Sequence, residues 1–194
     1  MRTKLFAVCL ALPALFVLPA AADDGPPLGE QFRNSFQTPP AVLTAPDTVF
    51  AGADGVELKM ADFRGRVLLV NFWATWCLPC VREMPSLDRL QAKLSDEGLV
   101  VLTVSNDRGG EPVIRRFYEE LSLQNLGVYS DARAKLAAAF GVRGLPTSYI
   151  VDADGTLLGR VQGHAEWDEP DAVALIRYYL DKARSAGHLK AGTG

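Results

Sequence analysis

The sequence predicts an α/β domain in which strands alternate with helices around a mostly parallel sheet, covered by helices on both faces. Two apolar, β-prone runs over 67–73 and 99–105 are typical of strands that are buried on both faces. The segment over 78–97 has the apolar periodicity of a helix, which favours a strand–helix–strand unit. A late Asp-Gly turn between two β-prone runs predicts an antiparallel hairpin over 147–163.

Length and composition indicate one globular domain with short tails. The chain has 194 residues, of which 48% are hydrophobic and 22% are charged. Its formal net charge of −3 argues against a nucleic-acid-binding surface and against a polybasic membrane patch.

The N-terminus is typical of an exported protein. A basic start is followed by an apolar stretch from Leu5 to Leu18, and small residues at Ala20 and Ala22 suit cleavage of a signal peptide over 1–22. An uncleaved membrane anchor is the alternative, because this stretch is just long enough to span a bilayer. Either way, we expect the rest of the chain to be exported.

The remaining chain divides into a spacer, a domain and a tail. Residues 23–45 are rich in Pro, Gly and polar residues, so we expect a flexible linker, although Phe32 and Phe36 could dock onto the domain. The folded domain is expected over 46–187, and a loose tail over 188–194.

The other elements of the domain follow from turn and helix signals. Leu87, Leu90 and Leu94 form the apolar stripe of the helix over 78–97, and Pro85 should kink it. Further along the chain we expect, in order, a hairpin over 47–60 around Asp54-Gly55, a helix over 112–121, a short strand over 126–130, a helix over 132–140 and a final helix over 169–186.

The motif Trp-Cys-Leu-Pro-Cys over 76–80 carries the chemistry. Outside the leader, which holds Cys9, the chain has two cysteines, Cys77 and Cys80. A disulfide between them would close a very short loop and hardly stabilise the fold. Cys77 falls at the start of a helix, where free N–H groups stabilise a thiolate, so it should be the nucleophile. Cys80 lies one turn deeper and should be the resolving thiol.

Two other interpretations of the cysteine pair stay open. A closed zinc site needs four ligands, and beyond the cysteines the chain offers only His164 and His188. A copper(I) site could be two-coordinate and use the two cysteines, with or without His164, as in a metallochaperone. The second of these interpretations, after a metal site, is an inert bridge. A peroxidase of related fold is disfavoured because it would need a lone peroxidatic cysteine.

Three segments carry a family resemblance that covers roughly 46–186. The stretch over 68–85, "LLVNFWATWCLPCVREMP", resembles the active-site strand, loop and kinked helix of the thioredoxin superfamily, in its exported TlpA/ResA branch. The stretch over 140–155 resembles the cis-proline loop of that family, and "GHAEWDEPDAVALIR" over 163–177 resembles the C-terminal part of its TlpA-type members. The resemblance implies a thioredoxin fold, with a central mixed sheet flanked by helices and an N-terminal hairpin extension.

The resemblance also implies a function. The protein would be a monomeric, periplasmic thiol–disulfide oxidoreductase that needs no cofactor or metal and acts on disulfides of exported client proteins. Reduced Cys77 would attack a client disulfide, and Cys80 would then release the client. A membrane electron donor would reduce the pair again. Clients could include copper-site proteins of cytochrome oxidase assembly, or proteins of cytochrome maturation. A disulfide-introducing oxidant remains the alternative, because a sequence does not set a reduction potential.

Two polar residues near the cysteines are candidates for proton transfer. Glu83 matches the acidic position of this branch and could take the proton that Cys80 must lose, but an ordinary solvated glutamate is an equal alternative. Asn71 stands where cytosolic thioredoxins carry a buried aspartate. Asparagine does not titrate, which adds weight to Glu83.

Residues around the motif are expected to bind clients. The resemblance implies a cis bond at Pro146, with Leu145 and Thr147 beside an extended client segment. Thr147 stands where relatives in cytochrome c maturation often carry Glu, which disfavours a dedicated haem-pathway role. Trp76 should line the client surface, and Pro79 should help to set the start of the helix and the redox poise.

The remaining aromatic and charged residues near the motif are expected to be structural. Trp73 should belong to the core. Glu166 and Trp167 are expected to pack against the domain and cap a helix, and His164 to lie in a surface turn.

Overall fold

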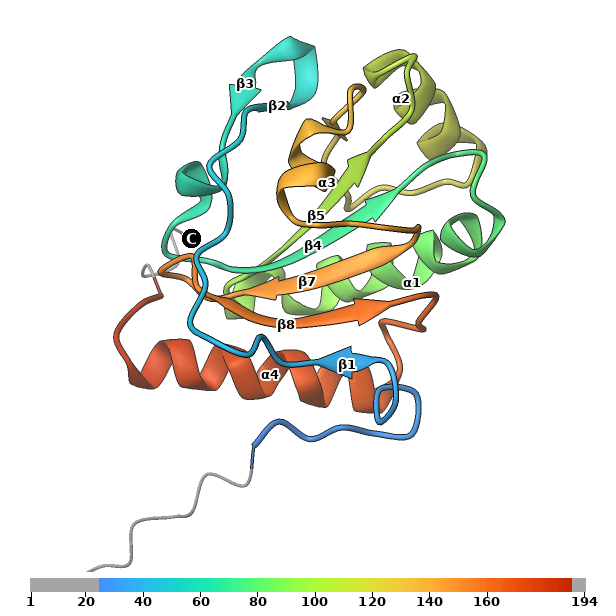
Figure 1. The fold of residues 1–194 in the computed structure, drawn as a ribbon. Coiled ribbons are helices and arrows are strands. Elements are labelled where there is room, and N and C mark those ends of the chain that lie inside the picture. The colour runs from blue at the N-terminus through green and yellow to red at the C-terminus, as the bar shows by residue number, and fades with distance from the viewer. Residues whose placement is uncertain (1–24, 190–194) are drawn as a thin grey trace, which may run out of the picture.

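The computed structural model describes residues 25–189, which form a single sheet with helices on both faces (Figure 1). The predicted leader over 1–22, with Cys9, and the tail residues 190–194 lie outside the described part. Within that part the sheet has eight strands in the order β1-β8-β7-β4-β5-β6-β2-β3. The strands are β1 (Phe36–Gln37), β2 (Phe50–Ala51), β3 (Glu57–Leu58), β4 (Val67–Trp73), β5 (Leu99–Ser105), β6 (Tyr129–Ser130), β7 (Thr147–Val151) and β8 (Leu157–Gln162).

The sheet is mixed, which corrects the mostly parallel sheet that the strand–helix alternation predicted. Only the pairs β4–β5 and β5–β6 are parallel. The hairpin β7–β8 runs antiparallel to β4, and the short strands β1, β2 and β3 also pair in antiparallel fashion. Strands of two residues have no detectable periodicity, so their pairing was not visible in the sequence. The mixed sheet agrees with the one that the family resemblance implied.

Alternate residues of β4 face two separate hydrophobic cores, because successive side chains of a strand point to opposite faces. One core lies under α1 (Leu78–Leu94) and α4 (Pro170–Ser185) and contains Val67, Leu69 and Trp73. The other lies under α3 (Lys135–Ala139) and contains Leu68, Val70 and Phe72. Figure 1 shows α3 on the opposite face of the sheet from α1 and α4. The helix α2 (Glu111–Glu120) contributes Ile114 and Tyr118 to the first core.

Helix α1 has the apolar stripe that the sequence predicted. Leu87, Leu90 and Leu94 are fully buried, and Pro85 lies inside the helix. The short helix η3 (Ser95–Glu97) then ends at Gly98, whose φ of 105° is in the left-handed region that glycine adopts readily.

Helix α3 is shorter than the predicted helix over 132–140. Ala134 has a φ of 51°, so regular helix begins only at Lys135. The carboxylate of Asp131 accepts the backbone N–H groups of Lys135 and Ala137, both at 2.9 Å, and so caps this start.

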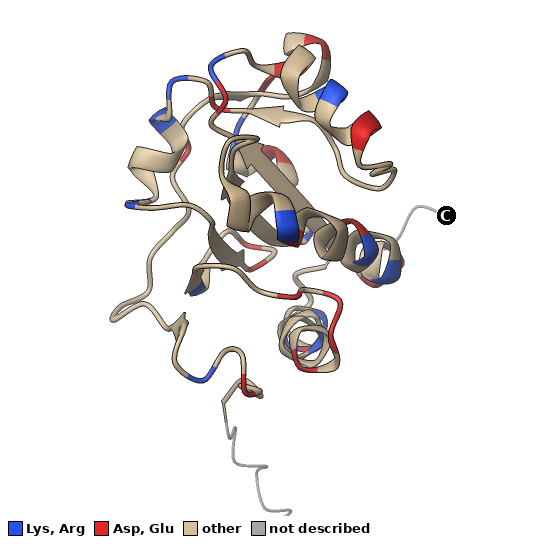
Figure 2. Cartoon of the chain, turned by 90° about the vertical axis from the view of Figure 1, so that its right-hand side faces the viewer, with Lys and Arg blue, Asp and Glu red and all other residues tan. Residues whose placement is uncertain are grey.

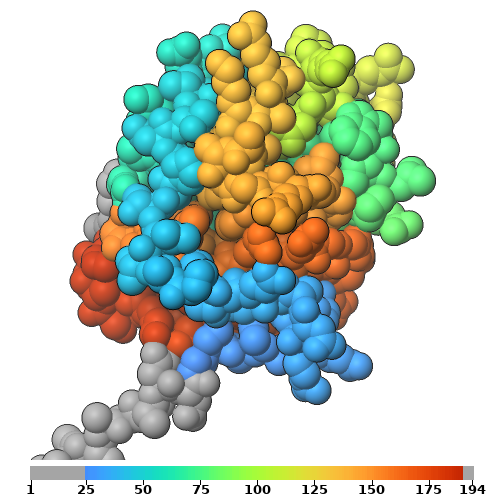
Figure 3. Space-filling view, viewed as in Figure 1, coloured from blue at the N-terminus to red at the C-terminus, as the bar shows by residue number. Residues whose placement is uncertain are grey.

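The segment over 25–45 packs on the domain, which corrects the expected flexible linker. Phe32 is fully buried, and its ring centroid lies 5.5 Å from that of Trp167. Strand β1 then pairs with β8, and Thr44 forms a bridge with Thr156. Figure 3 shows this segment (blue) lying along the body of the molecule. Burial of Phe32 outweighs the local preference for a mobile chain.

The predicted N-terminal hairpin is confirmed as β2 and β3, which pair around the one-turn helix η1 (Ala53–Gly55). Both Asp54 and Gly55 have positive φ, as a tight turn requires. Strand β2 also pairs with β6, so the hairpin extends the main sheet, and η2 (Met60–Phe63) leads from β3 toward β4.

The C-terminal end of the described chain is docked rather than loose. His188 Nδ1 lies 3.2 Å from Asp152 Oδ2, and Leu189 packs against the first core. The predicted loose tail over 188–194 is therefore wrong for these two residues. Within 25–189, none of the helices has both the length and the apolar character needed to cross a membrane.

Candidate active site

Cys77 and Cys80 form a disulfide where β4 gives way to α1. The bond has an S–S distance of 2.10 Å, and the two Cα atoms are 5.2 Å apart. Cys77 is the residue that precedes the first turn of α1, and Pro79 lies within that turn, where proline is well tolerated. The free N–H groups at this end of the helix favour negative charge on the sulfur of Cys77 after reduction.

The two sulfurs differ in access as the sequence predicted. Cys77 is 7% exposed, whereas Cys80 is completely buried. Trp76 and Leu78 flank Cys77 in the chain and are 69% and 73% exposed, so an apolar side chain projects on each side of Cys77 in the sequence. Trp73, by contrast, is buried in the core, which confirms the different places expected for the two tryptophans.

Asp107 holds the loop that precedes Cys77. Its carboxylate accepts the backbone N–H of Thr75 at 2.9 Å and the hydroxyl of Thr75 at 2.8 Å. It also accepts the hydroxyl of Ser105 at 2.8 Å. Asp107 is 5% exposed, so these bonds are shielded from water. The sequence analysis missed this residue, although an acidic residue just after the buried strand β5 was the available signal.

Glu83 is fully buried one turn after Cys80, which rules out the solvated glutamate that the sequence left open. Asn71 Nδ2 donates to Glu83 Oε1 at 2.5 Å, and the backbone N–H of Ala165 donates to Oε2 at 3.2 Å. Burial raises the pKa of Glu83 to about 8, against the opposing effect of these two hydrogen bonds. At neutral pH this carboxyl is therefore mostly in its acid form.

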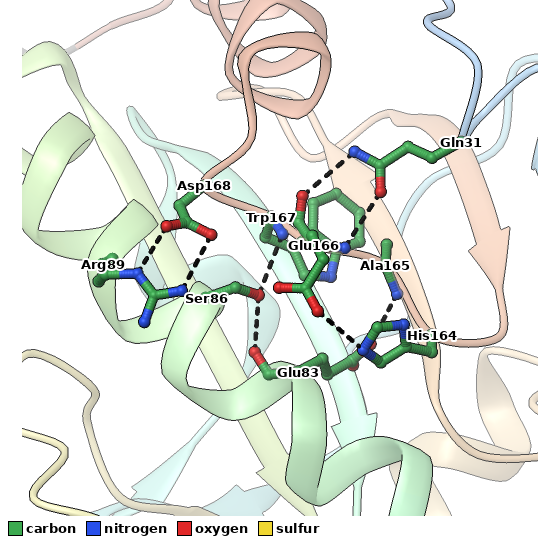
Figure 4. Close-up of polar contacts among 9 residues, drawn as sticks. All are labelled: Gln31, Glu83, Ser86, Arg89, His164, Ala165, Glu166, Trp167 and Asp168. Carbon is green, nitrogen blue, oxygen red and sulfur yellow. Dashed lines mark hydrogen bonds and ion pairs between the residues drawn. The ribbon is translucent and has the colours of Figure 1, made fainter.

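The segment over 164–168 is fastened to α1 beside Glu83 (Figure 4). The hydroxyl of Ser86 donates to the carbonyl of Glu83 at 2.7 Å and accepts the N–H of Trp167 at 3.0 Å. Arg89 binds Asp168 with two hydrogen bonds, of 2.5 and 3.2 Å. These contacts cover the helix face that carries Glu83 and keep water from it.

The segment is also tied to the N-terminal part of the chain. Gln31 exchanges two hydrogen bonds with the backbone of Glu166, of 3.0 and 3.1 Å (Figure 4). Trp167 is fully buried against Phe32, as its expected packing role requires. Glu166 has an exposed side chain that lies 3.3 Å from His164.

The peptide bond between Leu145 and Pro146 is cis, as the resemblance implied. Pro146 is buried and Leu145 is half-buried. Among the described residues, no hydrogen bond reaches the backbone N–H or carbonyl of Leu145. Thr147 is only 3% exposed, and its hydroxyl donates to the carbonyl of Gly144 at 2.7 Å, so little of it could touch a client directly.

The structure does not assemble the three- and four-ligand metal sites that the sequence left open. Within residues 25–189, the one group of three His, Cys or carboxylate ligands close enough to share an ion contains neither cysteine nor His164. That group consists of Asp152, Asp154 and His188. A three-ligand copper site with His164 and a zinc site with His188 are therefore not assembled among these residues, whereas a copper(I) site on the two cysteines alone needs no third ligand.

This chain matches the model of one protein family and is similar to known proteins. The model of the AhpC/TSA family matches residues 43–159, a range that includes both cysteines and Pro146. The thiol-disulfide oxidoreductase ResA of Geobacillus thermodenitrificans strain NG80-2 is 34% identical over 137 residues, which cover 68% of this chain and 76% of ResA.

Solved structures agree with this sequence similarity. The exposed lipoprotein thioredoxin Etrx1 of Streptococcus pneumoniae strain TIGR4 is 30% identical, with a TM-score of 0.57, over 71% of this chain and 99% of Etrx1. A thiol:disulfide interchange protein from Bacteroides sp. is 23% identical, with a TM-score of 0.60, over 78% of this chain and 97% of its own. At that identity the second likeness concerns the fold alone.

Proposed function

This chain belongs to the AhpC/TSA family and is a thiol–disulfide oxidoreductase with a thioredoxin fold, and from that premise we propose that it reduces disulfides of client proteins in the bacterial periplasm. One observation carries the proposal. Cys77 lies at the start of α1 between two residues whose side chains are exposed, and its partner Cys80 is buried behind it. In this arrangement Cys77 can attack the client disulfide from the surface, and Cys80 can then release the client by attacking Cys77 from the interior.

The reaction begins with the reduced pair. The thiolate of Cys77 attacks one sulfur of the client disulfide, so that a Cys77–client bond forms and the other client sulfur leaves as a thiolate. Cys80 loses its proton and attacks Cys77, which forms the Cys77–Cys80 bond and releases the second client thiolate. The client gains two electrons, and the protein ends in the disulfide form of this structure.

Glu83 supplies the proton transfer in this scheme. Its carboxylate form takes the proton of Cys80 before Cys80 attacks, and its acid form returns the proton when a donor reduces the disulfide. A group serves both directions best when its pKa lies near the working pH, and burial places the pKa of Glu83 at about 8. Asn71 and Ala165 hold the carboxyl in place through their hydrogen bonds.

The loop of Leu145 and Pro146 would hold the client. A client segment in extended conformation could pair with the backbone N–H and carbonyl of Leu145, to which no hydrogen bond runs within 25–189. The exposed ring of Trp76 would contact the client's apolar side chains. Pro79 would help to set the start of the helix and the reduction potential. Thr147, as the first residue of β7, would contribute to client binding through its position next to Pro146.

The N-terminal sequence supports export, and the family resemblance supports the partners. The predicted signal peptide or anchor over 1–22 supports a periplasmic site of action, with an inner-membrane tether if the leader is retained. A membrane electron donor would restore the reduced pair, and the protein would act as a monomer. Clients would include copper-site proteins of cytochrome oxidase assembly or proteins of cytochrome maturation, whose cysteines must be reduced before they bind copper or haem.

A trapping experiment tests the proposal. Cys80→Ser should accumulate mixed disulfides with exported proteins through Cys77, whereas the matched variant Cys77→Ser should accumulate none. Mass spectrometry of the trapped species would identify the clients. The absence of copper-site or cytochrome proteins among them would refute that client class, and equal trapping by both variants would refute the assigned roles.

The direction of transfer is tested by the reduction potential. A reductase should lie nearer the about −270 mV of thioredoxin than the about −120 mV of DsbA, a strong oxidant. Equilibration with glutathione buffers, followed by the tryptophan fluorescence of the protein, would measure it. A value close to that of DsbA would assign the protein as an oxidant instead.

A further inference from the structure

A groove of about 700 Å³ lies beside the active-site disulfide. Trp76, the neighbour of Cys77, lines one part of it, and Leu145, the neighbour of Pro146, lines another. Both are parts of the site where a client must react. Small side chains line the side formed by α3 and the residue before it, namely Ala134, Ala137 and Ala138. Figure 3 shows this helix and the loops around it (gold) on the face toward the viewer.

The groove is basic in a protein whose formal net charge is −3. Arg108, Arg133 and Arg143 line it and are exposed, and no Asp or Glu of the described chain is part of its lining. The two nearest acids in the sequence, Asp107 and Asp131, are each 5% exposed and accept backbone N–H groups. They therefore do not offer ion pairs to arginines at the surface.

The three arginines also lack partners of their own. No ion pair or hydrogen bond within residues 25–189 engages the guanidinium of Arg108, Arg133 or Arg143. Several other arginines do pair with carboxylates, and Figure 2 shows acidic and basic residues interspersed along the helices. Such pairs are Arg89–Asp168, Arg115–Glu111, Arg116–Glu120 and Arg177–Glu97.

We propose that this groove binds an acidic, extended segment of the client chain next to its reacting cysteine, an inference that rests on the proposed function. Guanidinium groups bind carboxylates with paired hydrogen bonds, and unpaired arginines give up no existing ion pair to do so. The small side chains of α3 leave room for a backbone, and Trp76 offers an apolar contact at the end nearest Cys77. The groove thus selects clients by charge, and the reduced Cys77 attacks the disulfide of the client that the groove holds.

Matched peptide substrates test this selection. Two short synthetic peptides would carry one cysteine as a mixed disulfide with mercaptoethanol, flanked either by Asp and Glu or by Asn and Gln. We expect the reduced protein to reduce the acidic peptide about tenfold faster at low ionic strength, because attraction between opposite charges raises the association rate. Added salt should narrow the difference.

Charge-matched variants locate the effect. The triple variant Arg108→Gln, Arg133→Gln and Arg143→Gln should lose the preference for the acidic peptide, and Arg143→Gln alone should lose part of it. The control removes the same charge from residues that do not line the groove, as Arg33→Gln, Lys93→Gln and Arg116→Gln. An equal loss in the control would overturn the proposal, since net charge alone would then explain the preference. Thermal unfolding monitors the fold of each variant.

A small neutral substrate separates this inference from the proposed function. Every variant should reduce hydroxyethyl disulfide at the rate of the wild-type protein, because that molecule carries no charge for the groove to select. If the wild-type protein does not reduce it, the proposed reductase function fails. If all variants reduce it normally and neither peptide is preferred, the groove proposal alone is overturned.

Discussion

Asn71 on β4 donates a hydrogen bond to Glu83 on α1, with 2.5 Å between Asn71 Nδ2 and Glu83 Oε1, and both residues are fully buried. The same Nδ2 donates to the hydroxyl of Ser148 at 2.9 Å. Because asparagine is neutral, Glu83 is the one titratable group of this buried pair. Burial favours the acid form of that group and raises its pKa to about 8, one helical turn from Cys80.

The titration of Glu83 should make the oxidised protein less stable as pH rises. The carboxyl has a pKa of 4.5 in an open chain and of about 8 in the fold, so between these values the unfolded chain releases a proton that the folded protein keeps. Each unit of pKa difference corresponds to about 1.4 kcal/mol, so the loss could reach about 5 kcal/mol by pH 8. Urea unfolding across this pH range would measure it.

Glu83→Gln provides the comparison for that experiment. Glutamine retains the shape of the side chain and does not titrate. The free energy of unfolding of this variant should therefore vary less as the pH rises from 4.5 to about 8. The exposed Glu57→Gln, at a position that does not act on the pKa of Glu83, should behave as the wild-type protein does. Parallel pH profiles for wild type and Glu83→Gln would show that Glu83 is not the responsible group.

The same variant should slow the release of clients. Without a base for its proton, Cys80 should attack the mixed disulfide more slowly, by about 10²-fold, the usual effect of losing a general base. The first attack by Cys77 should keep its rate. Rapid-quench kinetics with a model disulfide would resolve the two steps. If the Cys80 step of Glu83→Gln kept the rate and the pH dependence of the wild-type protein, the role of Glu83 would be purely structural.

Asp107→Ala should loosen the loop before Cys77. The backbone N–H of Thr75 would lose its acceptor in a largely buried place, at a cost of about 1–3 kcal/mol in the free energy of unfolding. Asp107→Asn should cost less, since its amide oxygen can still accept. Hydrogen exchange of the Thr75 amide, followed by NMR, should accelerate in the alanine variant. Unchanged protection would mean that other contacts hold the loop.

Phe32→Ala should destabilise the whole domain. Phe32 is fully buried against Trp167, and removal of a buried phenylalanine side chain costs about 3–5 kcal/mol. Leu43→Ala, at a position that is 47% exposed, should cost far less. Thermal unfolding and limited proteolysis of the N-terminal segment would report both changes. If Phe32→Ala unfolded like the wild-type protein, the segment over 25–45 would be the mobile linker that its composition predicted.

Local features of the chain were readable from the sequence because they depend on a few adjacent residues. The buried strand β4, the start of α1 at Cys77 and the deeper place of Cys80 all follow from apolar runs and a short spacing. The family resemblance added the cis bond at Pro146 and the mixed sheet, which periodicity did not reveal.

The environment of each group was decided by the tertiary structure alone. Glu83 is buried by partners that lie 12 and 82 residues away in the chain, Asn71 and Ala165, and its pKa follows from that enclosure. Phe32 belongs to the core, where it packs against Trp167 of the distant segment over 164–168. The groove likewise gathers arginines from separate loops. Burial and charge depend on distances through space, and spacing along the chain does not encode them directly.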